Sequence, residues 1–208
     1  GNYIDDKNAY MLGYVDARDR VKRVLSGSYE YGLNIKQTIN YIECHDNYTV
    51  YDKVSRFFDD EKMVSRICKL SMALVMISRG IPFINSGEEF LRTKHGIDNT
   101  YNLDDSINML DWHRKNNYLD VVEYFSDLCL LRKTYKEFTK ENVDIEFVDY
   151  YEVLIYKLGD LTIYINPCIF DHVYNDEREH EVIFDDSGFV NYKRSVLKIK
   201  AFSILITK

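Results

Sequence analysis

The sequence predicts an α/β segment over residues 1–138 followed by an antiparallel all-β segment over residues 139–208. Two short apolar runs, at residues 38–43 and 81–85, flank a stretch of helical periodicity. This order indicates two parallel strands joined by a right-handed helical crossover. After Phe138 the apolar period changes from that of a helix to that of strands. We therefore expect two domains that meet near residue 138.

Local signals define the elements in order. Apolar residues at helical spacing predict helices near residues 17–25, 64–75 and 121–129. Asp60 is a typical N-cap for the second helix, and Gly80 is a typical left-handed residue at its end. The second segment is predicted to contain strands at 143–148, 152–158, 161–166, 181–184 and 195–207. A Gly159-Asp160 hairpin turn joins two of them. We interpret this segment as an antiparallel β-sandwich.

Composition excludes several classes of partner. The 208 residues include 29% charged residues and carry a formal net charge of −7, which disfavours nucleic acid and anionic membrane surfaces. No apolar run approaches the roughly 20 residues of a membrane span. The 4 cysteines form no Cys-x-x-Cys pair, which disfavours zinc and dithiol sites and fits a reducing, cytoplasmic compartment. We expect no cofactor and no metal.

Polar side chains follow the first apolar run directly. It ends on His45, Asp46 and Asn47, and enzymes with parallel sheets present their chemistry at the carboxyl ends of strands in this way. A polar turn after a core strand is an equally good interpretation of this motif alone. A second feature favours function, because a long polar loop follows the other apolar run over residues 86–112. Loops of this length are uncommon in compact domains unless they are functional.

Several motifs then occur in a specific order. They are YIECHDN at 41–47, IPFINSGEEFLRTK at 81–94, Asn99-Thr100-Tyr101, Asp105, Ile107-Asn108 and Asp111-Trp112. Over residues 39–112 the chain resembles the last part of the catalytic barrel in the α-amylase superfamily of glycoside hydrolases. The closest resemblance is to type I pullulanases, which cleave α-1,6 branch links. The resemblance implies that the two apolar runs are strands seven and eight of a (β/α)8 TIM barrel.

The resemblance also implies that this barrel is incomplete. A (β/α)8 barrel takes about 250 residues, whereas 138 residues precede the β-segment. We expect strands one to five to be absent, together with the nucleophilic Asp and the general-acid Glu of the family. The chain alone should therefore be inactive. Strand 38–43 would lack a neighbour on one side, so we expect self-association through this exposed strand.

Site residues follow from the matched positions. Asp46 resembles the third acid of the superfamily, which stabilises the oxocarbenium-like transition state through sugar hydroxyls. His45 resembles the histidine that donates to the sugar at the cleavage point. Asp105 and Asn108 match positions on the donor side of the sugar cleft, and Tyr101 either stacks on a sugar or holds the loop. The structural alternatives are a loop-capping Asp, a structural His and a solvated loop acid.

Three further expectations concern chemistry and function. Adjacent side chains supply one metal ion poorly, so His45 and Asp46 are not expected to bind a metal. Glu88 and Glu89 are expected to make structural hydrogen bonds. The function that the resemblance implies is retaining cleavage of α-1,6 links in α-glucans such as pullulan, glycogen or starch dextrins. The alternatives are an isoamylase-like or α-1,4-glucan hydrolase fragment and a non-catalytic glucan-binding remnant.

Overall fold

The computed structural model describes residues 8–28 and 34–208, so residues 1–7 and 29–33 of the predicted first domain lie outside the described residues. The α-helices are α1 (Arg18–Leu25), α2 (Val50–Ser55), α3 (Glu61–Ile77), α4 (Asp105–Asn108), α5 (Trp112–Lys115) and α6 (Leu119–Thr134). The strands are β1 (Ile39–Asn40), β2 (Ile81–Pro82), β3 (Ile145–Tyr150), β4 (Val153–Leu158), β5 (Leu161–Asn166), β6 (His172–Asp185), β7 (Gly188–Ile199) and β8 (Ser203–Thr207). None of the helices in the described part of the chain is long and apolar enough to cross a bilayer.

A small parallel sheet holds the two loops predicted to form the site. β1 and β2 pair in parallel, with Ile39 opposite Ile81, and α2 and α3 lie between them in sequence. The parallel pairing agrees with the prediction, but each strand is two residues long, much shorter than the apolar runs. Backbone bonds from Ile81 N to Thr38 O (2.8 Å) and from Phe83 N to Asn40 O (2.9 Å) extend the contact slightly.

One face of this small sheet is open to solvent. Ile39 is 60% exposed and Tyr41 57%, and Ile81 and Phe83 are also exposed on β2 and just after it. An apolar run alone would indicate burial, but Ile39 and Tyr41 are not buried, because nothing among the described residues covers their side of the sheet. The Tyr41 and Phe83 rings contact edge to face at 6.0 Å. On the other side, Asn40 is buried.

Helix α3 begins at the predicted cap, but Gly80 is not the residue that ends it. The Asp60 carboxylate accepts a hydrogen bond from Lys62 N, as an N-cap does. The helix stops at Ile77, and the extended residue Ser78 is its C-cap. Gly80 lies beyond it in the turn into β2, with φ of +110°, where a Cβ would come within 2.5 Å of the Thr38 hydroxyl oxygen. Glycine is needed at this position for both reasons.

The C-terminal segment is a six-stranded antiparallel sheet with the order β3-β4-β5-β8-β6-β7. The hairpin at Gly159-Asp160 is confirmed, because Leu158 pairs with Leu161 across it. The single strand predicted at 195–207 is two strands, β7 and β8. They are separated by a turn in which Phe202 has a positive φ and its N–H donates to Cys168 O.

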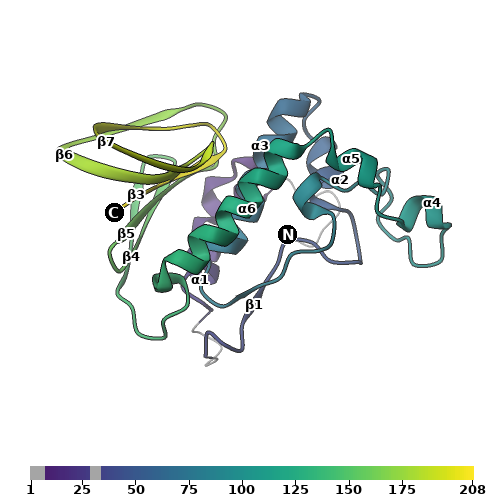
Figure 1. Ribbon diagram of the computed structural model, residues 1–208, viewed down its shortest axis with the longest axis horizontal. Coiled ribbons are helices and arrows are strands. Elements are labelled where there is room, and N and C mark those ends of the chain that lie inside the picture. Colours follow the sequence, from purple (N-terminus) through teal and green to yellow (C-terminus); the bar gives the residue numbers. More distant parts are fainter. Residues whose placement is uncertain (1–7, 29–33) are drawn as a thin grey trace.

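The β-segment differs from the predicted sandwich of two sheets. β6 pairs with both β7 and β8, so hydrogen bonding makes one continuous sheet. β6 pairs with β8 only at Val182 and Phe184, and the rest of the β6–β7 hairpin folds back over one face of β3–β5 (Figure 1), where the Tyr150 hydroxyl donates to Val173 O. A second, smaller apolar cluster, which includes Ile155, Tyr164 and Leu197, fills the space under this bend.

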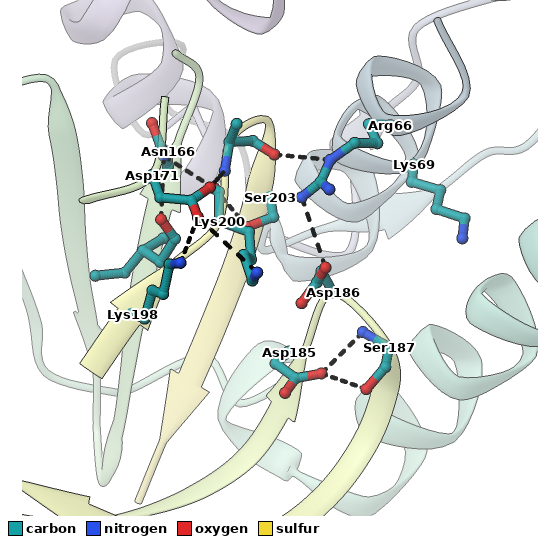
Figure 2. Close-up of polar contacts among 12 residues, drawn as sticks. Arg66, Lys69, Asn166, Asp171, Asp185, Asp186, Ser187, Lys198, Lys200 and Ser203 are labelled. Carbon is teal, nitrogen blue, oxygen red and sulfur yellow. Dashed lines mark hydrogen bonds and ion pairs between the residues drawn. The ribbon is translucent and has the colours of Figure 1, made fainter. Parts of the chain in front are cut away.

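Helices α3 and α6 cover the other face of the large sheet. One apolar cluster joins Ile67 of α3 and Leu128 of α6 to Ile163 and Ile206 of the strands. Figure 2 shows Arg66 of α3 reaching two turns of the β-segment. Its Nε donates to Ala201 O (3.0 Å), and its Nη2 lies 3.5 Å from an Asp186 carboxylate oxygen. The main core thus crosses residue 138, and the domain boundary there stays a prediction.

Candidate active site at the ends of the parallel strands

The loop after β1 presents two polar side chains to solvent. His45 Nε2 lies 3.4 Å from Asp46 Oδ1, and their side chains are 87% and 65% exposed. The next residue, Asn47, has a left-handed backbone with φ of +62°, a conformation that Asn tolerates better than most residues. The tight turn at Asn47 follows directly on the pair, and both side chains are accessible to a ligand.

A buried carboxyl group holds this loop in place. Glu43 is 4% exposed, and its Oε2 accepts a hydrogen bond from Val50 N at 2.6 Å. Its Oε1 accepts from Asn85 Nδ2 at 3.0 Å, which ties the end of β1 to the segment after β2. Burial raises the pKa of Glu43, and the hydrogen bonds from Val50 and Asn85 oppose that rise. The sequence motif included Glu43 without assigning it this role.

Glu88 and Glu89 make hydrogen bonds to backbone, as expected from their position after β2. Glu88 Oε2 accepts from Asn85 N at 3.2 Å, and Glu89 Oε2 accepts from Gly87 N at 2.9 Å. Burial, together with the nearby Glu43 charge, raises the pKa of Glu88 to about 9. Glu88 is therefore protonated and neutral at physiological pH, which lowers the cost of burying it.

Lys94 joins the long loop to the loop that carries His45 and Asp46. Its side chain is buried, and Nζ donates to the backbone oxygens of His45 (3.3 Å) and Asp98 (2.9 Å). Burial and the neighbouring Arg92 charge lower the pKa of Lys94. Sequence reasoning had not identified this role, because a buried lysine has no distinct residue pattern.

Asp52 fixes the other side of Lys94. Its carboxylate accepts from Lys94 N at 2.7 Å and from the Thr93 hydroxyl, and its own N–H donates to the Thr49 hydroxyl. Thr49 is the N-cap of α2. A Thr-x-x-Asp spacing before a helix resembles a capping box, so this signal could have identified the pair from sequence.

The predicted donor-side residues differ in how they are held. Asn108 is fully engaged in the loop: its Oδ1 accepts from the Thr100 hydroxyl at 2.7 Å, and its Nδ2 donates to the backbone oxygens of Thr100 and Leu103. Asp105 is exposed as the first residue of α4. Tyr101 is 81% exposed. The structure therefore presents Asp105 and Tyr101 to solvent, whereas the Asn108 amide holds the loop.

One group of side chains has the composition of a metal site. Ligand atoms of Cys44, His45 and Asp46 all lie within 4.8 Å of one another. The three residues are consecutive, and His45 and Asp46 are exposed. Adjacent residues rarely surround one ion, and the expectation that no metal binds here remains a prediction.

Comparison with known proteins shows which proteins this chain is similar to. No protein-family model matches it. The chain is 44% identical to the pullulanase of Bacillus subtilis (strain 168) over 105 residues. This match covers 49% of the chain and 14% of the Bacillus subtilis protein. Over 70 residues, or 34% of its length, the chain is 40% identical to the isoamylase of Flavobacterium sp, covering 9% of that protein. A crystal structure of the Anoxybacillus sp. LM18-11 pullulanase, complexed with maltotetraose, matches 96% of this chain with a TM-score of 0.88 and 27% identity.

This chain is a homologue of glycoside hydrolases named pullulanase and isoamylase, as its fold, its two loops and its relatives show together. Within that group the chain is similar to pullulanases in both sequence and fold, which confirms the resemblance found in its motifs. The chain spans 32% of the Anoxybacillus structure and 14% of the Bacillus subtilis protein. This extent is consistent with a C-terminal part of a pullulanase.

Proposed function

We propose that this chain forms the C-terminal part of a retaining glycoside hydrolase that cleaves α-1,6 links in α-glucans such as pullulan, glycogen or starch dextrins. The observation that carries the proposal is the open apolar face of β1 and β2, whose following loops expose Asp46 and His45. An apolar sheet face of this kind requires a covering element. In the proposal, β1 and β2 are strands seven and eight of a (β/α)8 barrel, and its other strands cover that face.

The site residues then have distinct roles. Asp46 accepts hydrogen bonds from sugar hydroxyls and strengthens them as the ring distorts toward the transition state. His45 donates to the same sugar. Asp105 and Tyr101 contact the sugar on the donor side, and Asn108 positions their loop through its bonds to Thr100. The likeness to a pullulanase solved with maltotetraose supports an α-glucan as the ligand.

The chain alone should not turn over substrate. Retaining hydrolysis needs one carboxylate as nucleophile and one carboxylic acid to protonate the leaving oxygen. Glu43, Asp52 and Glu88 are buried acids near the site, but each accepts hydrogen bonds that hold the loops together. None of them can approach a glycosidic bond without breaking those contacts. We therefore propose that the nucleophile and the acid come from the rest of the barrel.

Three alternatives make different predictions. An isoamylase-like specificity is supported by the 40% identical relative of that name, and it would favour branched glycogen over pullulan. An α-1,4 hydrolase would cleave linear maltooligosaccharides. A non-catalytic glucan-binding remnant would bind maltotetraose but stay inactive in any completed barrel.

A cytoplasmic location is part of the proposal, because the four cysteines are free.

The first test is an assay of the purified 208-residue chain on pullulan, with Asp46→Ala as the control for contaminating hydrolase. The proposal expects no turnover. Robust turnover that disappears in the Asp46→Ala variant would show that the catalytic carboxylates lie within this chain and would overturn the assignment.

Self-association of the same preparation is measured by light scattering. The exposed side chains of Ile39, Tyr41, Ile81 and Phe83 should drive dimers or larger species. Replacing Tyr41 and Phe83 with Ser should shift the chain toward monomer. Leu130→Gln is a matched control, because Leu130 is a 51% exposed apolar residue on α6 and is not part of this sheet. A monomeric wild-type chain would contradict this part of the proposal.

A further inference from the structure

A cavity of about 360 Å³ lies on the large sheet, on the face turned away from α3 and α6. Outward-facing residues of β5 and β8, Thr162, Tyr164 and Thr207, form part of its lining. Neighbouring residues Ile163 and Ile206 point to the opposite face and belong to the main core, as the alternation of strand side chains requires. The volume is within the range of small-molecule sites in proteins.

An irregular part of β6 forms the wall of this cavity. The register between β6 and β7 shifts between Asn175 and His180, so β6 carries extra residues there. Glu177 in this bulge has a left-handed backbone, with φ of +64°. β-Bulges re-aim side chains and are common beside functional sites. Here the bulge directs Tyr174, Arg178 and His180 toward the cavity.

Asp176 fixes the bulge from within. Its carboxylate accepts from Arg178 Nε at 3.0 Å and Nη2 at 2.6 Å, and it lies 2.7 Å from His180 Nε2. Burial, the largest single effect, raises the pKa of Asp176, but the hydrogen bonds from His180 and Arg178 together lower it to about 2. Ring contacts hold Tyr174, whose centroid lies 5.1 Å from those of both Tyr150 and Tyr164 and 6.4 Å from that of His180. The wall is therefore preorganised.

Charges around the cavity are mostly paired. Besides the contact between Arg178 and Asp176, Lys157 Nζ lies 3.0 Å from the Glu146 carboxylate. Glu179 lies 3.5 Å from Lys193 Nζ, and Lys208 adds a further cation to the lining. An anion would compete with the existing carboxylates for these cations. The lining instead offers aromatic rings, hydroxyls and charged hydrogen-bonding groups close together, which suits a neutral polyhydroxylated ligand.

We propose that this cavity binds a short segment of an α-glucan, at a second site separate from Asp46. The choice of α-glucan among neutral sugars rests on the proposed function. Tyr174 would contact the C–H face of a pyranose, backed by the buried Tyr164 ring, and Arg178 and Glu179 would hydrogen-bond its hydroxyls. Figure 1 shows the large sheet and α4 at opposite ends of the longest axis. A glucan bound on the sheet would thus be held away from the donor-side loop.

The test is a site-resolved titration of the isotopically labelled 208-residue chain with maltotriose, followed by amide NMR. Resonances around Thr162, Arg178 and Thr207 should shift and saturate together. Tyr174→Ala should weaken this site about tenfold, as expected for loss of one aromatic contact and its buried area. Arg178→Gln is a second variant, whose exposed side chain makes loss of the fold unexpected, and it should weaken binding severalfold. Tyr151→Ala is the matched control, because Tyr151 is 76% exposed and does not line the cavity.

Each other outcome overturns a stated part of the proposal. Shifts confined to the loops of Asp46 and Tyr101 would overturn the second site and leave the proposed function standing. Shifts at the cavity with inorganic phosphate but not with maltotriose would show an anion site. Equal binding of β-linked cellotriose would overturn the assignment to α-glucan. An affinity that Tyr174→Ala and Arg178→Gln both leave unchanged would place the ligand elsewhere.

Discussion

Arg132 on α6 should be one of the most sensitive positions for stability. Its guanidinium is nearly buried, and Nη1 donates to Met76 O at 2.6 Å and Ser78 O at 2.7 Å. Nη2 donates to Gly80 O. These oxygens belong to the last turn of α3 and the turn that follows, where a helix leaves carbonyls without partners. Arg132 therefore connects α6 to the entry of β2.

The size of the effect follows from these contacts. Hydrogen bonds to a charged group contribute roughly 1.5–3 kcal/mol each, and Arg132→Met removes three of them. The loss is offset in part because burial disfavours the charged guanidinium, and desolvation lowers the pKa of Arg132 to about 10. We expect a net decrease of about 3–5 kcal/mol in the free energy of unfolding, typical of breaking a buried polar network.

Urea unfolding followed by circular dichroism measures this decrease, provided that the m-value stays constant. Lys133→Met is the matched control, because the neighbouring Lys133 is exposed and should change stability by only about 0.5 kcal/mol. A decrease below about 1 kcal/mol for Arg132→Met would refute the inference that these bonds hold the end of α3.

Three other predictions test the loops and their supports. Gly80→Ala should lower the free energy of unfolding by about 2–4 kcal/mol, because Gly80 has a positive φ and a Cβ there would clash with the Thr38 hydroxyl. Gly96→Ala is the control and should lower it by about 1 kcal/mol, because Gly96 also has a positive φ but open space around it. Thermal unfolding compares the two variants, and equal losses of stability would contradict the argument. The pKa of Glu88 in the folded state is about 9, above that of an unfolded Glu. Between these two values the folded state keeps a proton that the unfolded state releases. The free energy of unfolding should therefore decline from about pH 4 to about pH 9. Glu88→Gln should flatten that decline, as stability curves at several pH values would show; an unchanged slope would contradict it. Asp105→Ala should weaken maltotetraose binding while changing the free energy of unfolding by about 0.5 kcal/mol or less. Calorimetry measures the binding in a Tyr174→Ala background, so that the sheet cavity does not contribute. An unchanged affinity would return Asp105 to the class of solvated loop acids.

Local signals predicted the parts of the fold that depend on local physics. The Asp60 cap and the apolar period after it placed α3, and Gly159-Asp160 placed the hairpin between β4 and β5. The exposure of Ile39 and Tyr41 could not be predicted in the same way. An apolar run indicates that a face should be covered, but whether a covering element is present depends on the rest of the structure. The same limit led to the prediction of a sandwich in place of one bent sheet.

The candidate site was predictable only in part. The ordered motifs identified the loops of Asp46 and Asp105, and the roles of those residues stay predictions. The supports of the loops were not visible, because Glu43 contacts Asn85, and Lys94 contacts the backbone of His45, across more than 40 positions of sequence. Such polar pairs have no periodicity and no fixed spacing. Only the three-dimensional arrangement reveals them.

The most direct measurement is the pullulan turnover of a chimera in which this chain replaces its matched region in the Bacillus subtilis pullulanase. That region includes 105 residues at 44% identity, and the host supplies the other strands of the proposed barrel. The account predicts a chimera that cleaves pullulan, and an Asp46→Asn chimera whose kcat is lower by a factor on the order of 100 with little change in KM. A folded, active chimera in which Asp46→Asn leaves kcat near the unmodified value would contradict the assignment of Asp46 to transition-state stabilisation.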